Sequence, residues 1–205
     1  MSDQIVGVLL AGGLARRLGG GDKGLRKLAG KAVLDIIIER INGQVDQLIL
    51  NANGDSARFS NYKMPVVADV VPDFAGPLAG VLTGLEWMRE NQPNAKWLVS
   101  LPTDAPFIPL DLVTRLMDAI SNGAEMACAK SAGRTHPVVG IWPVSLLEDL
   151  KHAMLVEDIR KVDRWTGRYN TVHVEFDIIP VDPFFNANRA EDFDEAERLY
   201  KLLHN

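Results

Sequence analysis

The sequence predicts an α/β fold: a single-domain, three-layer sandwich in which helices cover both faces of a mostly parallel, twisted sheet. The first observation is that short apolar runs of strand length alternate with segments whose apolar residues recur at helical spacing. The second is that 205 residues, 47% of them hydrophobic, suit one globular core. No repeat, low-complexity tract or linker divides the chain, so we expect residues 1–205 to form one domain.

The predicted strands are short runs rich in apolar residues. The first, residues 5–10, is continuously apolar, as expected for a strand buried on both faces of a parallel sheet. The last, residues 171–176, alternates between apolar and polar side chains, which predicts one face in contact with water. Between them lie the predicted strands 47–51, 65–69, 97–101, 125–129 and 138–142.

Helices are predicted where apolar residues recur every three or four positions. Pro77 suits the first turn of a helix, because its missing N–H would have no partner there. Negative charge stabilises a helix N-terminus, and the last helix, with apolar residues at helical spacing as far as Leu203, begins with an acidic turn. That turn contains Glu191, Asp192 and Asp194. The other predicted helices cover 32–41, 77–88, 110–120, 143–154 and 157–166.

Composition excludes several classes of protein. The formal net charge of −5 argues against a protein that binds nucleic acid nonspecifically. No apolar stretch approaches the length of a membrane span, and the run 5–10 is too short for a signal peptide core. We therefore expect a cytoplasmic protein. Its one cysteine, Cys128, lies in an apolar run and is expected to pack inertly.

The loop after the first strand has the composition of a phosphate site. Glycines leave backbone N–H groups uncovered, and successive N–H groups bind anions. Cationic side chains add charge-assisted hydrogen bonds to phosphate oxygens. A flexible, solvated loop is the alternative, but the position after the first strand favours a triphosphate site. The loop contains Gly12, Gly13, Arg16, Arg17, Gly19, Gly20, Gly21, Lys23 and Gly24.

Better-known motifs do not fit. A Walker loop needs Gly-Lys-Ser/Thr, whereas Lys23 follows Asp22 and precedes Gly24. A G-x-G-x-x-G match begins only at Gly19, too far beyond Leu10 to form the tight turn of a dinucleotide site. The histidines lack zinc spacing, no G-x-S-x-G elbow occurs, and a thiol pair is absent.

Polar residues follow three further strands, at the edge where α/β sheets bind ligands. Asp104 comes just past the strand 97–101 and is suited to Mg²⁺, which prefers carboxylates and substrate phosphates; a turn or helix cap is the alternative. Asn51 and Asp69 end the second and third strands. Asn51 offers a donor and an acceptor together, which suits a base edge or ribose, and both residues are also common in turns.

Weaker candidates lie elsewhere. His136, before a proline, is either a general base or a partner in a loop hydrogen bond. Asn186 and Asn188 precede the last helix, where Asn188 either caps it or completes a polar pocket. The glycine-rich run 76–80 precedes a helix whose first N–H groups can bind an anion.

Together these motifs resemble the molybdenum cofactor guanylyltransferase family over nearly the whole chain. Sugar-nucleotide and cytidylyl transferases share the opening glycine loop but usually lack the Asp22-Lys23 pair. The matching motifs, in order, are residues 9–13 (LLAGG), Arg17, 19–25 (GGGDKGL), 51–53 (NAN), 76–80 (GPLAG), 103–106 (TDAP), 136–137 (HP) and 185–188 (FNAN). The resemblance implies the Rossmann-like fold of nucleotide-diphospho-sugar transferases.

The resemblance also implies roles for residues. Asp104 would bind Mg²⁺ and, through it, GTP, while Lys23 and Arg17 would meet the phosphates as catalytic groups. Asn186 and Asn188 would face the molybdopterin side. The residues implied to contact the guanine nucleotide are Leu10, Ala11, Gly12, Gly13, Lys23, Asn51, Asp69 and Asp104.

The implied reaction is transfer of GMP from GTP to the terminal phosphate of molybdopterin, with release of pyrophosphate. Proteins of cofactor biosynthesis and molybdoenzyme chaperones are the further implied partners. Two alternatives stay open at this point: a transferase that uses CTP, or an NTP with a sugar phosphate, and a GTP-binding module without transfer activity.

Overall fold

The protein, described by a computed structural model over residues 3–11, 22–71 and 76–204, is built on a seven-stranded sheet. The strand order is β5-β4-β1-β6-β8-β7-β9, and β2 and β3 form a separate two-stranded sheet. The strands are β1 (Gln4–Leu10), β2 (Lys27–Leu28), β3 (Lys31–Ala32), β4 (Gln47–Asn51), β5 (Val66–Val67), β6 (Ala95–Pro102), β7 (Met126–Ser131), β8 (Arg134–Pro143) and β9 (Thr171–Phe176).

The predicted mostly parallel sheet is confirmed. β1 pairs in parallel with β4 on one side and β6 on the other, and the β4–β5 and β7–β9 pairs are also parallel. β8 is antiparallel to both of its neighbours, β6 and β7. The carboxyl ends of β4, β1 and β6 therefore meet at one edge of the sheet.

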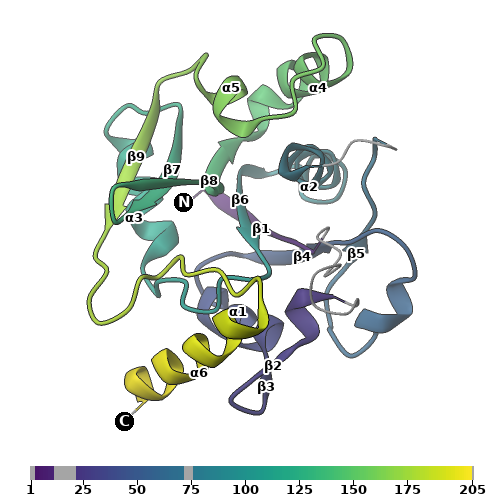
Figure 1. Cartoon of the computed structure of the whole chain (residues 1–205). Helices are drawn as coiled ribbons and strands as arrows, with labels where there is room; N and C mark the ends of the chain where they lie inside the picture. Colours follow the sequence, from purple (N-terminus) through teal and green to yellow (C-terminus); the bar gives the residue numbers. More distant parts are fainter. Residues whose placement is uncertain (1–2, 12–21, 72–75, 205) are drawn as a thin grey trace.

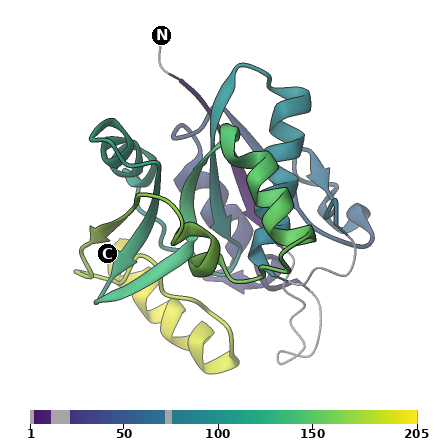
Figure 2. The same cartoon turned by 90° about the horizontal axis from the view of Figure 1, so that it is seen from above.

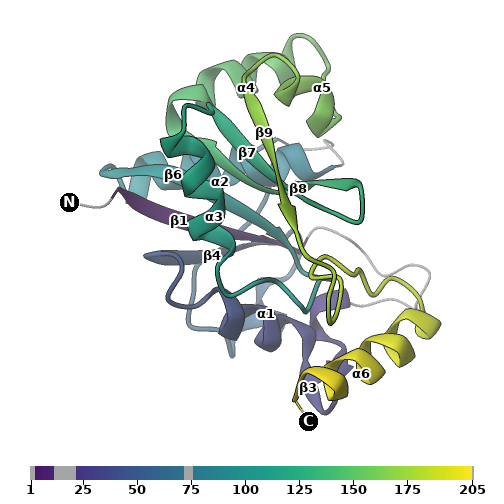
Figure 3. The same ribbon diagram turned by 90° about the vertical axis from the view of Figure 1, so that its left-hand side faces the viewer.

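Helices cover both faces of the sheet, which confirms the three-layer sandwich (Figures 1 and 3). Val8 belongs to the buried cluster that includes α2, α4 and α5, whereas its neighbour Leu9 belongs to the cluster that includes α1, α3 and α6, because successive side chains of a strand point to opposite faces. Figure 2 shows α4 alongside α2. The helices are α1 (Val33–Ile41), α2 (Pro77–Asn91), α3 (Leu112–Ser121), α4 (Leu147–Leu155), α5 (Val162–Thr166) and α6 (Ala190–His204).

Three predicted elements differ in extent. The run 65–69 pairs only over β5, so Asp69 lies beyond the strand end. The helix predicted over 157–166 forms only over α5. The segment 134–137 belongs to β8 rather than to a loop, because Ala132 and Gly133 take positive φ angles of 48° and 72° and close a tight hairpin.

Within the described residues, no helix is long and apolar enough to cross a bilayer.

Candidate active site

The candidate site lies at the carboxyl ends of β1, β4 and β6. Leu10 at the end of β1 is in register with Asn51 of β4 and with Pro102 of β6. The Ala11 N–H donates to the Asn51 carbonyl oxygen at 2.9 Å, so the chain stays paired as it leaves the sheet. Thr103 Oγ1 donates to the Leu10 carbonyl oxygen at 3.3 Å, which ties the end of β6 to the end of β1.

On the β6 side, three predicted residues meet. Lys23 Nζ donates to Asp104 Oδ2 at 3.3 Å and to Asn188 Oδ1. The Lys23 and Asp104 side chains are 23% and 17% exposed, so both are held in place and still reachable by a ligand. A cation, a carboxylate and an amide brought from three distant segments form a small polar cluster, which we call the lysine cluster.

Backbone contacts fix the lysine cluster. The Ala187 N–H donates to the Asp104 carbonyl oxygen at 2.9 Å and holds the segment before α6 against the loop after β6. Gly24 packs against Thr103: an added Cβ at Gly24 would lie 3.2 Å from the Thr103 Cβ. The turn that presents Lys23 therefore rests directly on the segment that presents Asp104.

Asn188 does not cap α6 through its side chain. The Asp192 carboxylate accepts hydrogen bonds from the backbone N–H groups of Asn188 and Arg189, each at 2.8 Å. A carboxylate inside the first turn satisfies these unpaired donors, which leaves the Asn188 amide free to face Lys23. The Asn188 side chain therefore accepts from Lys23 rather than capping the helix.

On the β4 side, two asparagines hold one aspartate. Asn51, 4% exposed, donates through Nδ2 to Asp69 Oδ1 at 2.8 Å. Asn53 Nδ2 donates to Asp69 Oδ2 at 2.7 Å, and the Asp69 N–H donates to Asn53 Oδ1 at 2.8 Å. Both carboxylate oxygens of Asp69 thus have a fixed direction, and we call these three residues the asparagine cluster.

Helix α2 closes against this cluster at Gly80. A Cβ added there would lie 2.5 Å from Asn51 Oδ1 and 2.5 Å from Leu10 Cδ2. A side chain there would force α2, Asn51 or Leu10 to shift, so glycine lets the helix approach the strand ends this closely. The run 76–80 thus contributes close packing beside the asparagine cluster.

The two clusters lie on either side of β1. Since neighbouring strands are ~4.8 Å apart, the ends of β4 and β6 are separated by about 10 Å. The lysine cluster and the asparagine cluster therefore lie beyond the ends of two strands that β1 separates. Of the remaining predicted contacts, Leu10 is half-buried and Ala11 buried, while Gly12, Gly13, Arg16 and Arg17 lie outside the described residues.

Two predicted residues lie apart from the clusters. Asn186 is exposed, and its side chain forms no hydrogen bond with any described residue. His136 Nε2 lies 2.8 Å from Ser131 Oγ, which in turn donates to Asp182 Oδ1 at 2.8 Å. Burial lowers the pKa of His136, against a smaller opposing effect of Asp182, which favours the neutral ring. His136 thus bonds to Ser131 within the β7–β8 hairpin, and Ser131 in turn links that hairpin to the segment leading to α6.

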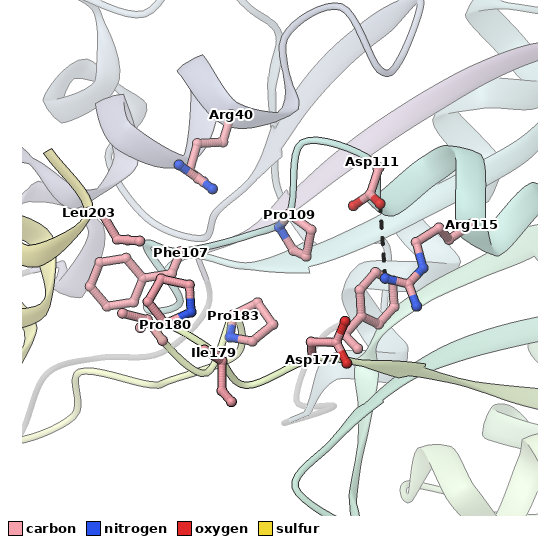
Figure 4. Close-up of a pocket in the computed structure, with 12 residues that line it drawn as sticks. Arg40, Phe107, Pro109, Asp111, Arg115, Asp177, Ile179, Pro180, Pro183 and Leu203 are labelled. Carbon is pink, nitrogen blue, oxygen red and sulfur yellow. Dashed lines mark ion pairs between the residues drawn. The ribbon is translucent and has the colours of Figure 1, made fainter.

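A pocket of about 190 Å³ lies on the face covered by α1, α3 and α6 (Figure 4). None of the predicted site residues lines it. Its arginines are engaged: Arg115 lies 3.9 Å from Asp111 and donates to the Glu175 carbonyl oxygen, while Arg40 Nε donates to the Ile108 carbonyl oxygen. The pocket is therefore separate from the two clusters.

The sequence reasoning did not find Arg58, and it gave Asn53 no separate role. Asn53 donates to Asp69 and Arg58 donates to Asp22, so each side chain holds a group that comes from another loop. The spacing of the run 51–53 placed Asn53 beside Asn51, but its pairing with Asp69 depends on how two loops meet. Nothing in the local sequence around Arg58 marks its partner.

Comparison with known proteins decides the family. The family model described as the MobA-like NTP transferase domain matches residues 7–172. The molybdenum cofactor guanylyltransferase of Rhodopseudomonas palustris is 54% identical over 193 residues, which cover 94% of this chain and 90% of the relative. The chain belongs to the MobA-like NTP transferase family. The resemblance to molybdenum cofactor guanylyltransferases is thereby confirmed.

Solved structures show the same fold. Molybdopterin-guanine dinucleotide biosynthesis protein A from Archaeoglobus fulgidus superimposes with a TM-score of 0.76 at 21% identity, covering 96% of this chain and 99% of that one. A Mycobacterium tuberculosis protein solved in complex with manganese superimposes with a TM-score of 0.68 at 19% identity, covering 95% and 98%. That structural neighbour therefore carries a divalent metal.

Proposed function

We propose that this protein transfers GMP from GTP to the terminal phosphate of molybdopterin, releasing pyrophosphate and forming molybdopterin guanine dinucleotide. The observation that carries the proposal is the 54% identity, over 94% of the chain, to a molybdenum cofactor guanylyltransferase. The two clusters flanking β1 support it, because they provide a polar anchor for each end of a nucleotide.

The donor groups fit a hard divalent cation with few protein ligands. No group of three or more His, Cys, Asp or Glu side chains that could hold a metal occurs among the described residues. Asp104 supplies one carboxylate, and its Oδ1 accepts no hydrogen bond from any described residue. Mg²⁺ usually binds one or two carboxylates together with substrate phosphates and water, so we name Asp104 as the Mg²⁺ ligand. When bound, Mg²⁺ would neutralise charge on the phosphates.

In the proposed reaction, an oxygen of the molybdopterin phosphate attacks the α-phosphorus of GTP. A P–O bond forms between that oxygen and the α-phosphorus. The bond from the α-phosphorus to the oxygen that bridges it to the β-phosphorus breaks, and pyrophosphate leaves with the electron pair of that bond. Positioning and charge stabilisation supply most of the catalysis in such displacements. Lys23 and Arg17 would stabilise the charge on the leaving pyrophosphate.

No protein base is needed at the attacking phosphate, because a phosphate monoester is largely ionised near pH 7. This agrees with the position of His136, whose Nε2 is engaged by Ser131. Asp69, with both oxygens held by asparagines, is placed in our proposal at the ribose or base. Leu10, Ala11 and Asn51 would line the same end of the nucleotide, and Asn186 and Asn188 would face the pterin.

The remaining parts of the proposal concern the cell. We place the enzyme in the cytoplasm, with GTP and molybdopterin as its small-molecule partners. Proteins that supply molybdopterin or accept the finished cofactor are the expected protein partners. Neither nucleic acid nor a membrane is part of the proposed function.

The experiment that tests the proposal measures pyrophosphate release with molybdopterin, Mg²⁺ and each NTP in turn. Release with GTP, dependent on molybdopterin, is the expected result. Release with CTP, or only with a sugar phosphate as acceptor, would contradict the assigned substrates while keeping the reaction class. GTP binding without release under any condition would indicate a binding module instead.

A further inference from the structure

Arg58 connects three segments around the candidate site. It lies in the short 3-10 helix η3 (Ser56–Phe59) that follows β4. Its Nε donates to Asp22 Oδ2 at 2.6 Å, its Nη2 donates to the Asn53 carbonyl oxygen at 2.7 Å, and its Nη1 donates to the Asp55 carbonyl oxygen. One rigid guanidinium therefore fixes the relative positions of the Asp22 side chain and the loop after β4.

Both ends of this connection reach the candidate site. Asp22 directly precedes Lys23, the centre of the lysine cluster. Asn53 holds Asp69 in the asparagine cluster. Arg58 therefore connects the two clusters through its hydrogen bonds to Asp22 and to the Asn53 carbonyl oxygen. This connection adds to the pairing of β4, β1 and β6.

Charge gives Arg58 a second role. Asp22 places a carboxylate, only 10% exposed, next to the lysine that we propose binds phosphates. An unpaired carboxylate there would repel a triphosphate, and a poorly solvated charge without a partner is costly. The guanidinium of Arg58, 28% exposed, neutralises it. Arg58 is itself held by its stacking over the buried Phe59 ring, with Cζ 4.6 Å from the ring centroid.

We propose that Arg58 is a positioning residue for nucleotide binding: it keeps the phosphate end and the base end of the site at a fixed separation and neutralises Asp22. This inference rests on the proposed function only in taking the two clusters as the nucleotide site. It assigns Arg58 no contact with the nucleotide and no step in the chemistry.

The test measures GTP binding directly, by calorimetry with Mg²⁺, together with pyrophosphate release. Arg58→Ala is expected to weaken GTP binding about tenfold or more, because it leaves the Asp22 carboxylate unpaired and releases the loop after β4. Arg58→Lys is expected to recover part of the affinity, since an ammonium neutralises Asp22 but lacks the planar fork that also holds the Asn53 carbonyl oxygen.

The decisive variant is Arg58→Ala combined with Asp22→Asn. If charge on Asp22 is the problem, the double variant binds GTP more tightly than Arg58→Ala alone, although more weakly than the wild type. Arg89→Ala is the matched control, because Arg89 pairs with the exposed Glu148 on α4, at a position the site does not use. It is expected to leave the Kd for GTP unchanged.

The outcomes separate this proposal from the proposed function. Wild-type turnover with GTP, together with a Kd of Arg58→Ala within about twofold of the Arg89→Ala value, would overturn the role of Arg58 alone. A lower Tm with an unchanged Kd would also overturn it, because Arg58 would then be merely structural. If Arg58→Ala does not fold, Arg58→Lys still decides: an unchanged Kd contradicts the need for a planar fork. Absence of GTP binding by the wild type would contradict the proposed function instead.

Discussion

Substitution of Gly80 by alanine tests the closest approach in the site. An added Cβ would lie 2.5 Å from Asn51 Oδ1 and from Leu10 Cδ2, whereas ordinary contacts begin at 3.4 Å. Asn51 is buried and bonded to Asp69 and to the Val67 carbonyl oxygen, so it has little freedom to yield. Either α2 moves outward or Asn51 leaves Asp69.

Both responses have a calculable size. Overpacking costs ~1–3 kcal/mol, and the better helix propensity of alanine returns about 1 kcal/mol, so the net loss of stability is ~0–2 kcal/mol. For a domain of this size that lowers Tm by at most about 8 °C. A hydrogen bond to a charged group contributes ~1.5–3 kcal/mol, so displacement of Asn51 is expected to raise the KM for GTP about tenfold to a hundredfold.

Gly84→Ala is the matched control. Gly84 lies one turn further along α2, and a Cβ there would meet only aliphatic atoms, Leu98 Cδ2 at 2.9 Å and Val8 Cγ1 at 3.2 Å. We expect Gly84→Ala to change Tm but not the KM for GTP, and Gly80→Ala to change both. Thermal unfolding and initial rates at varied GTP make the comparison. Equal KM values for the two variants would refute the assignment of Asn51 to the nucleotide site.

Four further results are expected. Asp104→Ala is expected to lose turnover while its Tm stays near the wild-type value. Lys23→Ala is expected to be ~10²–10³ slower, as is typical when one charge-stabilising group is removed. Near-normal pyrophosphate release by either variant would contradict the catalytic role assigned to that residue. Burial lowers the pKa of His136 below its ordinary 6.5, so the imidazole binds a proton more tightly in the unfolded chain than in the folded protein. The stability contributed by the neutral ring is therefore present above pH 6.5 and is lost as the pH falls. Denaturant unfolding between about pH 7.5 and about pH 5.5 should therefore show a weaker pH dependence for His136→Asn than for the wild type, and identical slopes would contradict the burial argument. Burial also raises the pKa of Cys128 to about 12, so we expect a thiol reagent to label Cys128 only after unfolding, and rapid labelling of the native protein at neutral pH would be inconsistent with this structure.

Much of the fold followed from local patterns. The spacing of apolar residues in α1 and α3 encodes which helix face is buried, and the continuous apolar run of β1 indicates burial on both faces. Element ends were less well determined. β5 is shorter than its apolar run, because pairing with β4 decides where a strand ends.

The place of the site also followed from the sequence. In α/β sheets, ligands bind at the carboxyl ends of parallel strands, and Asn51, Asp69 and Asp104 follow such strands. Residue types that suit phosphates and a cation were visible in the loops around Lys23 and Asp104. Their chemical roles stay predictions that the experiments above test.

Only the tertiary structure decided which of these residues meet. Lys23 and Asn188 are 165 positions apart, and Asp22 and Arg58 are 36 apart. The antiparallel direction of β8 and the contact of Asn53 with Asp69 likewise join distant parts of the chain. The sequence by itself predicted most elements and the sheet edge at which the candidate site lies, because local periodicity records burial. The pairing of side chains depends on strand order and loop packing, and these are properties of the whole chain that no local pattern records.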